Sequence, residues 1–208
     1  MAATPQRALI VIDLQNDYFP DGKFPLWNTE AVLAQVESAI ARARAQGVPV
    51  ILVQHIADAP NGAAPFFNAG TSGVELHPRI LAAAPDAVVV TKAQADSFLN
   101  TALEKTLAEL GANELLICGM MTQNCVTHTA ISRAAEKYRV AVLGDCCASV
   151  SQIIHLIALK ALVARVRALM DAGAATTSLD AQALATEAIP ALTAFQEALT
   201  DTAKEILG

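Results

Sequence analysis

The chain has 208 residues, of which 54% are hydrophobic and 16% are charged, so it can bury a sizeable core and cannot be disordered throughout. Its 14 basic and 20 acidic residues give a net charge of -6, which disfavours nucleic-acid binding and points to a small-molecule or protein partner. Aromatic residues account for 4% of the chain, and the abundance of alanine, leucine, valine and isoleucine favours a helix-rich α/β protein over a β-sandwich.

No targeting or membrane-spanning segment is expected. The N-terminal residues lack a basic leader, and the most hydrophobic stretch, 153–170, is interrupted by Lys160, Arg165 and Arg167. None of the 4 cysteines forms a C-x-x-C pair, and a chain of this length needs no disulfides. We therefore expect a reduced, cytoplasmic protein that does not bind a membrane.

Short β-branched runs alternate along the chain with longer helical patterns. Asn28 and Asn100 are placed as N-caps of helices, and Gly47 and Gly111 as the glycines that end them. The expected strands are 8–14, 48–54, 87–91, 114–118 and 140–143, with a weak sixth strand at 175–178. The expected helices are 29–46, 100–110, 124–137 and 151–172, followed by two helical segments separated near Pro190.

This alternation predicts one α/β domain. Buried strands separated by helices indicate βαβ units, and right-handed crossovers give a three-layer α-β-α sandwich around a doubly wound, mostly parallel six-stranded sheet. We expect the domain to occupy residues 1–180, with 181–208 as a helical extension of it. The long segment 56–85 is rich in proline and glycine and lacks strong periodicity, so a lid or pocket wall is expected there.

Polar residues follow the predicted strands at the edge where open parallel sheets bind ligands. Asp13 comes at the end of the first strand, Lys92 after the third, and Cys125 shortly after the fourth. A carboxylate, a cation and a thiol at one edge are typical of a nucleophilic site. Lys92 and a helix N-terminus favour the thiolate of Cys125, while Asp13 can move the thiol proton and also opposes a second negative charge. Nearby backbone N–H groups, with Gly119 allowing a tight turn, can form an oxyanion hole.

Four segments resemble those of the isochorismatase-like cysteine hydrolases, over about residues 7–175: ALIVIDLQNDYF, VTKAQADSFLNTALEKTL, ICGMMTQNCVTHTA and VLGDCCAS. The resemblance implies an Asp-Lys-Cys triad at Asp13, Lys92 and Cys125. It also implies a non-proline cis peptide bond between Met120 and Met121, and an oxyanion hole made by the backbone amides of Met121 and Cys125.

Two features indicate which subgroup of that family the chain resembles. Siderophore-pathway isochorismatases usually lack the cysteine and hydrolyse a vinyl ether, so Cys125 indicates the amidase side of the family. Nicotinamidases bind a metal through an Asp-x-His pair and a later His, but here Val53 stands in the Asp position of Val53-Gln54-His55. We therefore expect no metal and no other cofactor. The Gln-His ending instead resembles carbamoylsarcosine amidase and streptothricin hydrolase.

A second set of residues is predicted to contact the substrate: Gln15, Phe19, His55, Phe66 and Phe67. The alternatives are that the phenylalanines hold loops in place and that His55 bonds a loop backbone. A metal site made by His55 with Asp58 and His77 is disfavoured, because such a site needs three convergent ligands. His155 is interpreted as an ordinary helix residue.

The favoured function is hydrolysis of a C–N bond. Cys125 attacks an amide or carbamoyl carbonyl, an amine or ammonia leaves, and water cleaves the thioester. Vinyl-ether hydrolysis driven by Asp13 and a catalytically silent scaffold are the alternatives. Apolar positions near the C-terminus predict a homo-oligomer, at least a dimer: Leu184, Ile189, Leu192, Phe195, Leu199 and Ile206.

Overall fold

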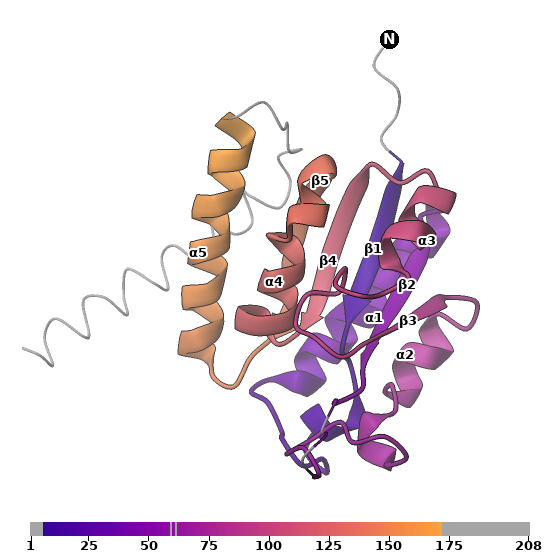
Figure 1. The fold of residues 1–208 in the computed structure, drawn as a ribbon, viewed down its shortest axis with the longest axis vertical. Coiled ribbons are helices and arrows are strands. Elements are labelled where there is room, and N and C mark those ends of the chain that lie inside the picture. The colour runs from indigo at the N-terminus through magenta and orange to yellow at the C-terminus, as the bar shows by residue number, and fades with distance from the viewer. Residues whose placement is uncertain (1–5, 59, 61, 172–208) are drawn as a thin grey trace, which may run out of the picture.

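A computed structural model describes residues 6–58, 60 and 62–171, which form a twisted parallel sheet with helices on both faces (Figure 1). The strands are β1 (Arg7–Ile12), β2 (Val50–His55), β3 (Val88–Lys92), β4 (Glu114–Met120) and β5 (Arg139–Ala148). The helices are α1 (Thr29–Ala45), α2 (Pro78–Ala83), α3 (Leu103–Glu109), α4 (Thr127–Ala130) and α5 (Gln152–Asp171). Short turns of helix lie at Asn16–Tyr18, Ser72–Val74, Thr122–Val126 and Arg133–Lys137.

The strand order is β3-β2-β1-β4-β5, and every pairing is parallel. The order reverses at β1, because the chain first adds β2 and β3 on one side and then β4 and β5 on the other. The predicted α/β sandwich is thus confirmed, with five strands among the described residues. The sixth strand at 175–178 and the extension 181–208 lie outside the described residues. In the described part, no helix combines the length and the apolar character needed to cross a bilayer.

The centre of the core is β1. Residues from Ala8 to Ile12 are each at most 1% exposed, because helices cover both faces of a parallel sheet. One side of α1 is buried through residues at helical spacing, among them Val32, Val36 and Ile40. This packing fixes the carboxyl ends of β1, β2, β3 and β4 relative to one another, and the predicted polar residues lie at these ends.

Helix ends follow the sequence prediction at the glycines but not at the asparagines. Gly47 and Gly111 have φ values of 68° and 64°, as expected of residues that end helices. Asn28 and Asn100, predicted as N-caps, instead adopt left-handed conformations with φ of 61° and 57°. Asn28 makes no side-chain capping bond to α1, and α3 begins only at Leu103. Asparagine tolerates this backbone region, so the same residue type serves here as a turn.

Two other boundaries differ from the prediction. The helix expected over 124–137 is divided, because the Ser132 hydroxyl accepts a hydrogen bond from the Ala134 amide and starts a new helical turn there. The last strand, expected to end at residue 143, continues to Ala148. The register of β4 and β5 shifts between Ile117 and Gly119, which lets β5 pass through the polar Asp145 and pair again at Cys147.

Gly119 is required where β4 approaches β1. Its φ is +122°, and an added Cβ would lie 2.0 Å from the carbonyl oxygen of Ile12. We expect Gly119→Ala to lower the free energy of unfolding by about 3 kcal/mol or more, since backbone strain and overpacking act together. Urea denaturation followed by circular dichroism measures the loss.

The matched control is Gly47→Ala. This glycine also has a positive φ, of +68°, but nothing lies within 4 Å of an added Cβ. The expected loss is therefore about 1 kcal/mol, from the backbone conformation alone. Equal losses in the two variants would show that the close approach to Ile12 contributes nothing.

Candidate active site

The structure brings Asp13, Lys92 and Cys125 together at the carboxyl ends of the strands. Asp13 directly follows β1, Lys92 is the last residue of β3, and Cys125 lies in the helical turn Thr122–Val126 after β4. The Lys92 Nζ atom is 2.8 Å from Asp13 Oδ2 and 3.2 Å from Cys125 Sγ. The three residues are 0%, 4% and 1% exposed, respectively, so the group is enclosed by protein.

The Lys92 ammonium lies among four acceptors. Besides Asp13 and Cys125 it contacts His55 Nδ1 at 2.9 Å and the carbonyl oxygen of Gln94 at 3.1 Å. Burial alone would lower the pKa of Lys92, but Asp13 and Cys125 outweigh it, and the pKa is raised. The Lys92 ammonium has donors and no lone pair, so His55 Nδ1 accepts from it and the proton of the neutral ring lies on Nε2.

Asp13 offers an unused acceptor. Its Oδ2 atom is 2.8 Å from Lys92 Nζ, and neither carboxylate oxygen makes a well-aligned hydrogen bond to a residue in the described part of the chain. The side chain is fully buried, so both oxygens are also shielded from bulk water. A buried carboxylate oxygen without a partner is costly unless something occupies it during function, and it can accept a proton here.

The thiol of Cys125 is held in its neutral form. Burial raises its pKa, Asp13 raises it further, and Lys92 opposes both effects without overcoming them. At the sequence level, Lys92 and a helix N-terminus weigh against Asp13 at this thiol; in the structure the residue is also buried. Because the resting thiol keeps its proton, attack on a substrate requires a base, and Asp13 lies within reach: its carboxylate and Cys125 Sγ are no more than 4.8 Å apart.

The turn that carries Cys125 is fixed by two hydrogen bonds that the sequence did not reveal. The peptide bond between Met120 and Met121 is cis, at the position that the family resemblance implied. Next to it, the Thr122 hydroxyl donates to the carbonyl oxygen of Ala148 and contacts His155 Nδ1, each at 2.9 Å. His155, interpreted as an ordinary helix residue, thus ties α5 to the nucleophile turn. No local signal marks it, because the contact spans 33 residues of sequence.

Gln15 has a different role from the predicted substrate contact. Its Oε1 accepts from the backbone amide of His55 at 2.7 Å, and its Nε2 donates to the carbonyl oxygens of His55 and Val74 at 2.8 and 2.6 Å. Both amide hydrogens are therefore used, and the residue is fully buried. Gln15 fixes the end of β2, and with it His55, to the segment that follows.

An aromatic cluster borders the triad on the side of the predicted lid. Phe67 lies 4.5 Å from Tyr18 and 5.8 Å from His55, and Phe66 lies 5.4 Å from Tyr18, measured between ring centroids. Of the predicted aromatic contacts, Phe67 is thus the one beside His55. Sequence reasoning missed Tyr18, which is 1% exposed and follows the polar run after β1.

Phe19 is not part of the aromatic cluster beside the triad. Its ring packs on His77 at 4.3 Å, and it lines a separate cavity of about 520 Å³. Asp17, which lines the same cavity, anchors the aromatic cluster, since its carboxylate accepts from the backbone amides of Phe67 at 2.7 Å and Lys23 at 3.2 Å.

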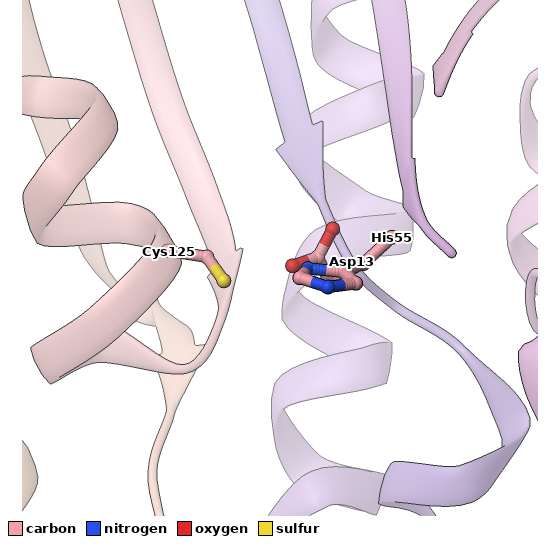
Figure 2. Close-up of side chains that lie close together, drawn as sticks. All are labelled: Asp13, His55 and Cys125. Atoms are coloured by element: carbon pink, nitrogen blue, oxygen red, sulfur yellow. The ribbon is translucent and has the colours of Figure 1, made fainter. Parts of the chain in front are cut away.

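The residues do not fit a nicotinamidase-type metal site. Val53, in the position of that site's aspartate, is 0% exposed in the core of β2 and offers no ligand atom. A different group of possible ligands is present, in which Asp13, His55 and Cys125 offer an oxygen, a nitrogen and a sulfur within 4.8 Å of one another (Figure 2). Lys92 already contacts all three.

Comparison with known proteins gives consistent matches. The sequence profile of the isochorismatase domain matches residues 7–174. An uncharacterised isochorismatase family protein of Bacillus subtilis is 40% identical over 142 residues, covering 68% of this chain and 77% of that protein. A streptothricin hydrolase of Streptomyces noursei is 32% identical over 144 residues, covering 69% of this chain and 55% of that protein. Among solved structures, an Oleispira antarctica protein of the isochorismatase hydrolase type has a TM-score of 0.70 at 34% identity, covering 89% of this chain and 99% of that one.

Proposed function

The chain belongs to the isochorismatase domain family, and from that premise we propose that it hydrolyses a C–N bond of a small amide or carbamoyl compound. The observation that carries the proposal is the enclosed group of the Cys125 thiol, the Lys92 ammonium and the Asp13 carboxylate, in which Lys92 Nζ lies 3.2 Å from the sulfur and 2.8 Å from the carboxylate. These are the parts that nucleophilic acyl transfer needs. The similarity to a streptothricin hydrolase supports the amide-cleaving side of the family.

In the first half-reaction, Cys125 Sγ attacks the carbonyl carbon while Asp13 takes the thiol proton. The carbonyl electron pair moves onto oxygen, and we assign the backbone amides of Met121 and Cys125 to stabilise that negative charge. The tetrahedral intermediate then collapses, the C–N bond breaks, and Asp13 returns the proton to the departing nitrogen. A thioester on Cys125 and a free amine or ammonia result.

In the second half-reaction, Asp13 takes a proton from water as the water oxygen attacks the thioester. The C–S bond breaks, the carboxylic or carbamic acid leaves, and Asp13 gives the proton back to the sulfur of Cys125. Lys92 remains an ammonium throughout and stabilises whichever of the two groups is negative, because it contacts both. At the end of the second half-reaction, Asp13 and Cys125 have therefore returned to their starting protonation states.

We assign substrate contacts to His55 and to the aromatic residues Phe66 and Phe67. The Nδ1 atom of His55 is occupied by Lys92, so its Nε2–H is the atom that can donate to an acceptor on the substrate. Burial and Lys92 both lower the pKa of His55, which keeps the ring neutral. The site therefore suits a small, uncharged substrate with an acceptor near its scissile carbonyl.

The test is direct detection of the thioester. The protein is incubated with a panel of small primary amides and carbamoyl compounds, quenched in acid, and weighed by intact mass spectrometry, while ammonia release is followed in parallel. We expect an adduct of acyl mass on the peptide that contains Cys125, with every substrate that releases ammonia. Ammonia release without any adduct, even under rapid quenching, would argue against covalent catalysis.

Turnover is expected to survive removal of divalent ions. Lys92 already supplies the positive charge beside Asp13 and Cys125, and the nicotinamidase-type ligand set is broken at Val53. Activity is measured after exhaustive chelation and dialysis, with residual metal determined by elemental analysis. A metal-free preparation that loses its activity and regains it with zinc or manganese would contradict the expectation.

We propose that the protein is a homo-oligomer, at least a dimer. Helix α5 carries exposed apolar side chains, with Ile153, Ile154 and Ile157 at 45%, 38% and 51% exposure, and Lys160 is the one charged residue between 152 and 163. Large apolar side chains grouped on an exposed helix surface are normally covered by a partner. Light scattering at micromolar concentration is expected to give at least twice the chain mass of 21.7 kDa.

A matched pair of variants tests which surface is responsible. Ile157→Asp is expected to lower the measured mass, whereas Leu81→Asp, at a residue of α2 that is 43% exposed, should leave it unchanged. A wild-type mass near that of one chain would refute the proposal. Equal effects of both substitutions would exclude α5 as the specific interface.

We also propose that the protein works in a reducing compartment such as the cytoplasm. All four cysteines are free and buried, and Cys125 has no disulfide partner in the described structure. A catalytic thiol of this kind is protected where glutathione keeps thiols reduced.

A further inference from the structure

We propose that Asp13, His55 and Cys125 form a latent binding site for a soft divalent cation such as Zn²⁺, which the Lys92 ammonium normally fills. The metal would block the enzyme rather than assist it, because it would bind the nucleophile and the base themselves. The inference goes beyond the proposed hydrolysis and does not depend on the identity of the substrate.

The geometry of the ligand atoms supports the proposal. One carboxylate oxygen, one imidazole nitrogen and one thiol sulfur lie within 4.8 Å of one another (Figure 2). Oxygen, nitrogen and sulfur donors in this combination are the usual protein ligands of zinc, at bond lengths of about 2.0–2.3 Å. The Lys92 Nζ atom lies 2.8 Å, 2.9 Å and 3.2 Å from these donors, so a metal at its position needs each to move inward by roughly 1 Å.

The surroundings of the site suit this small movement. Asp13 directly follows β1, His55 is the last residue of the neighbouring strand β2, and Cys125 faces them from the turn after β4. His55 is only half-buried, so its ring has room to turn toward a metal. The carbonyl oxygen of Gln94, 3.1 Å from Nζ, is a fourth acceptor around the same point. The four acceptors around Lys92 Nζ match the four ligands that zinc prefers.

Charge explains why the site is latent. In the resting enzyme, the Lys92 ammonium and the Asp13 carboxylate cancel, and the thiol of Cys125 is neutral. Lys92 is the cationic partner of Asp13 among residues 6–58, 60 and 62–171. Replacing Lys92 by an uncharged residue leaves a fully buried carboxylate without a counter-ion, which is strongly unfavourable. A divalent ion that binds the carboxylate and the thiolate, with release of the thiol proton to solvent, restores neutrality.

The proposed metal site differs from a catalytic metal centre because its ligands are the reacting groups themselves. A metal bound here occupies the sulfur that attacks the substrate and the oxygen that moves the proton. Binding of metal and formation of the thioester therefore exclude each other. We expect micromolar zinc to inhibit the wild-type enzyme reversibly, with activity restored by a chelator.

The decisive test uses Co²⁺, because cobalt bound to a thiolate gives a charge-transfer band in the near ultraviolet. The protein is titrated with Co²⁺ as wild type, Lys92→Leu and Lys92→Arg. We expect Lys92→Leu to bind one Co²⁺ about tenfold more tightly than wild type, or better, because the competing ammonium is gone. Lys92→Arg keeps the positive charge and should resemble wild type. Circular dichroism establishes that each variant is folded, and Lys92→Gln replaces Lys92→Leu if the latter does not fold.

A second substitution identifies the ligands. Adding Cys125→Ala to Lys92→Leu should abolish the charge-transfer band, and adding His55→Ala should weaken binding. Equal Co²⁺ affinity in wild type and the folded uncharged Lys92 variant would overturn the proposal, as would a band that survives the loss of Cys125. None of these readouts requires turnover, so they remain informative even if the proposed hydrolysis is wrong.

Discussion

Cys125→Ala is expected to lower turnover by about 10³-fold or more while leaving the fold intact. The substitution removes the sulfur that forms the thioester and leaves Asp13 and Lys92 paired as before. Loss of one buried sulfur atom should cost only about 1 kcal/mol of stability, as for other small truncations in a core. Steady-state kinetics on the best substrate of the amide panel, together with the unfolding midpoint in urea, measure both quantities.

Cys118→Ala is the matched control for this experiment. Cys118 is also a fully buried thiol, but it lies within β4, where it pairs with Val11 of β1, and not in the turn that carries the nucleophile. We expect a similar loss of stability and no loss of turnover. If instead Cys125→Ala keeps nearly wild-type activity, thioester formation is wrong, and vinyl-ether hydrolysis driven by Asp13 becomes the leading interpretation.

Asp13→Asn is the second substitution with an expected loss of about 10³-fold or more. Asparagine keeps the size of the side chain but cannot take the proton of the Cys125 thiol, which burial keeps in place. The loss should appear in both half-reactions, since the same carboxylate serves the thiol, the leaving nitrogen and the attacking water. Rapid-quench measurement of thioester formation and decay separates the two steps.

Glu114→Gln is the matched control. Glu114 is a buried carboxylate, 3% exposed and paired with Arg7 at 2.7 Å, but it lies at the opposite end of the sheet. Its replacement should affect stability and leave both steps unchanged. Normal formation of the thioester in Asp13→Asn would show that Asp13 is not the base in the first half-reaction.

Lys92→Ala tests the cation that pairs with both Cys125 and Asp13. We expect a strong loss of activity, because neither the thiolate of Cys125 nor the carboxylate of Asp13 would then have a counter-ion. The losses from the three single substitutions should not add in the double variants, since the residues act as one unit.

Local patterns were enough to predict the sheet. The run from Ala8 to Ile12 predicts a strand buried on both faces, and the structure places it at the centre of the sheet. The same reasoning failed where a tertiary contact overrides periodicity. The helix expected over 124–137 is interrupted at Ser132, whose hydroxyl also donates to the Asp96 carboxylate, 36 residues away. A contact over that distance leaves no trace in the spacing of apolar residues.

Strand ends can be read from the sequence, and they place the candidate catalytic residues at one edge of the sheet. The family resemblance implies the triad of Asp13, Lys92 and Cys125. Independently of it, the residue that follows each strand of a parallel sheet lies at the carboxyl end, so the strand ends predict that these three share one edge. That inference uses only the ends of strands, which local composition reveals, and not the contacts of any side chain.

The tertiary structure alone decided what each of these groups does. The direction of the Cys125 pKa depends on burial and on the distance to Asp13, and both follow from how the turn after β4 packs on β1. The tautomer of His55 depends on Lys92, 37 residues away, and the role of Gln15 depends on backbone atoms of His55, 40 residues away. Solvation and electrostatic interactions act through space at a few ångströms, so they are fixed only when segments distant in the sequence have packed together.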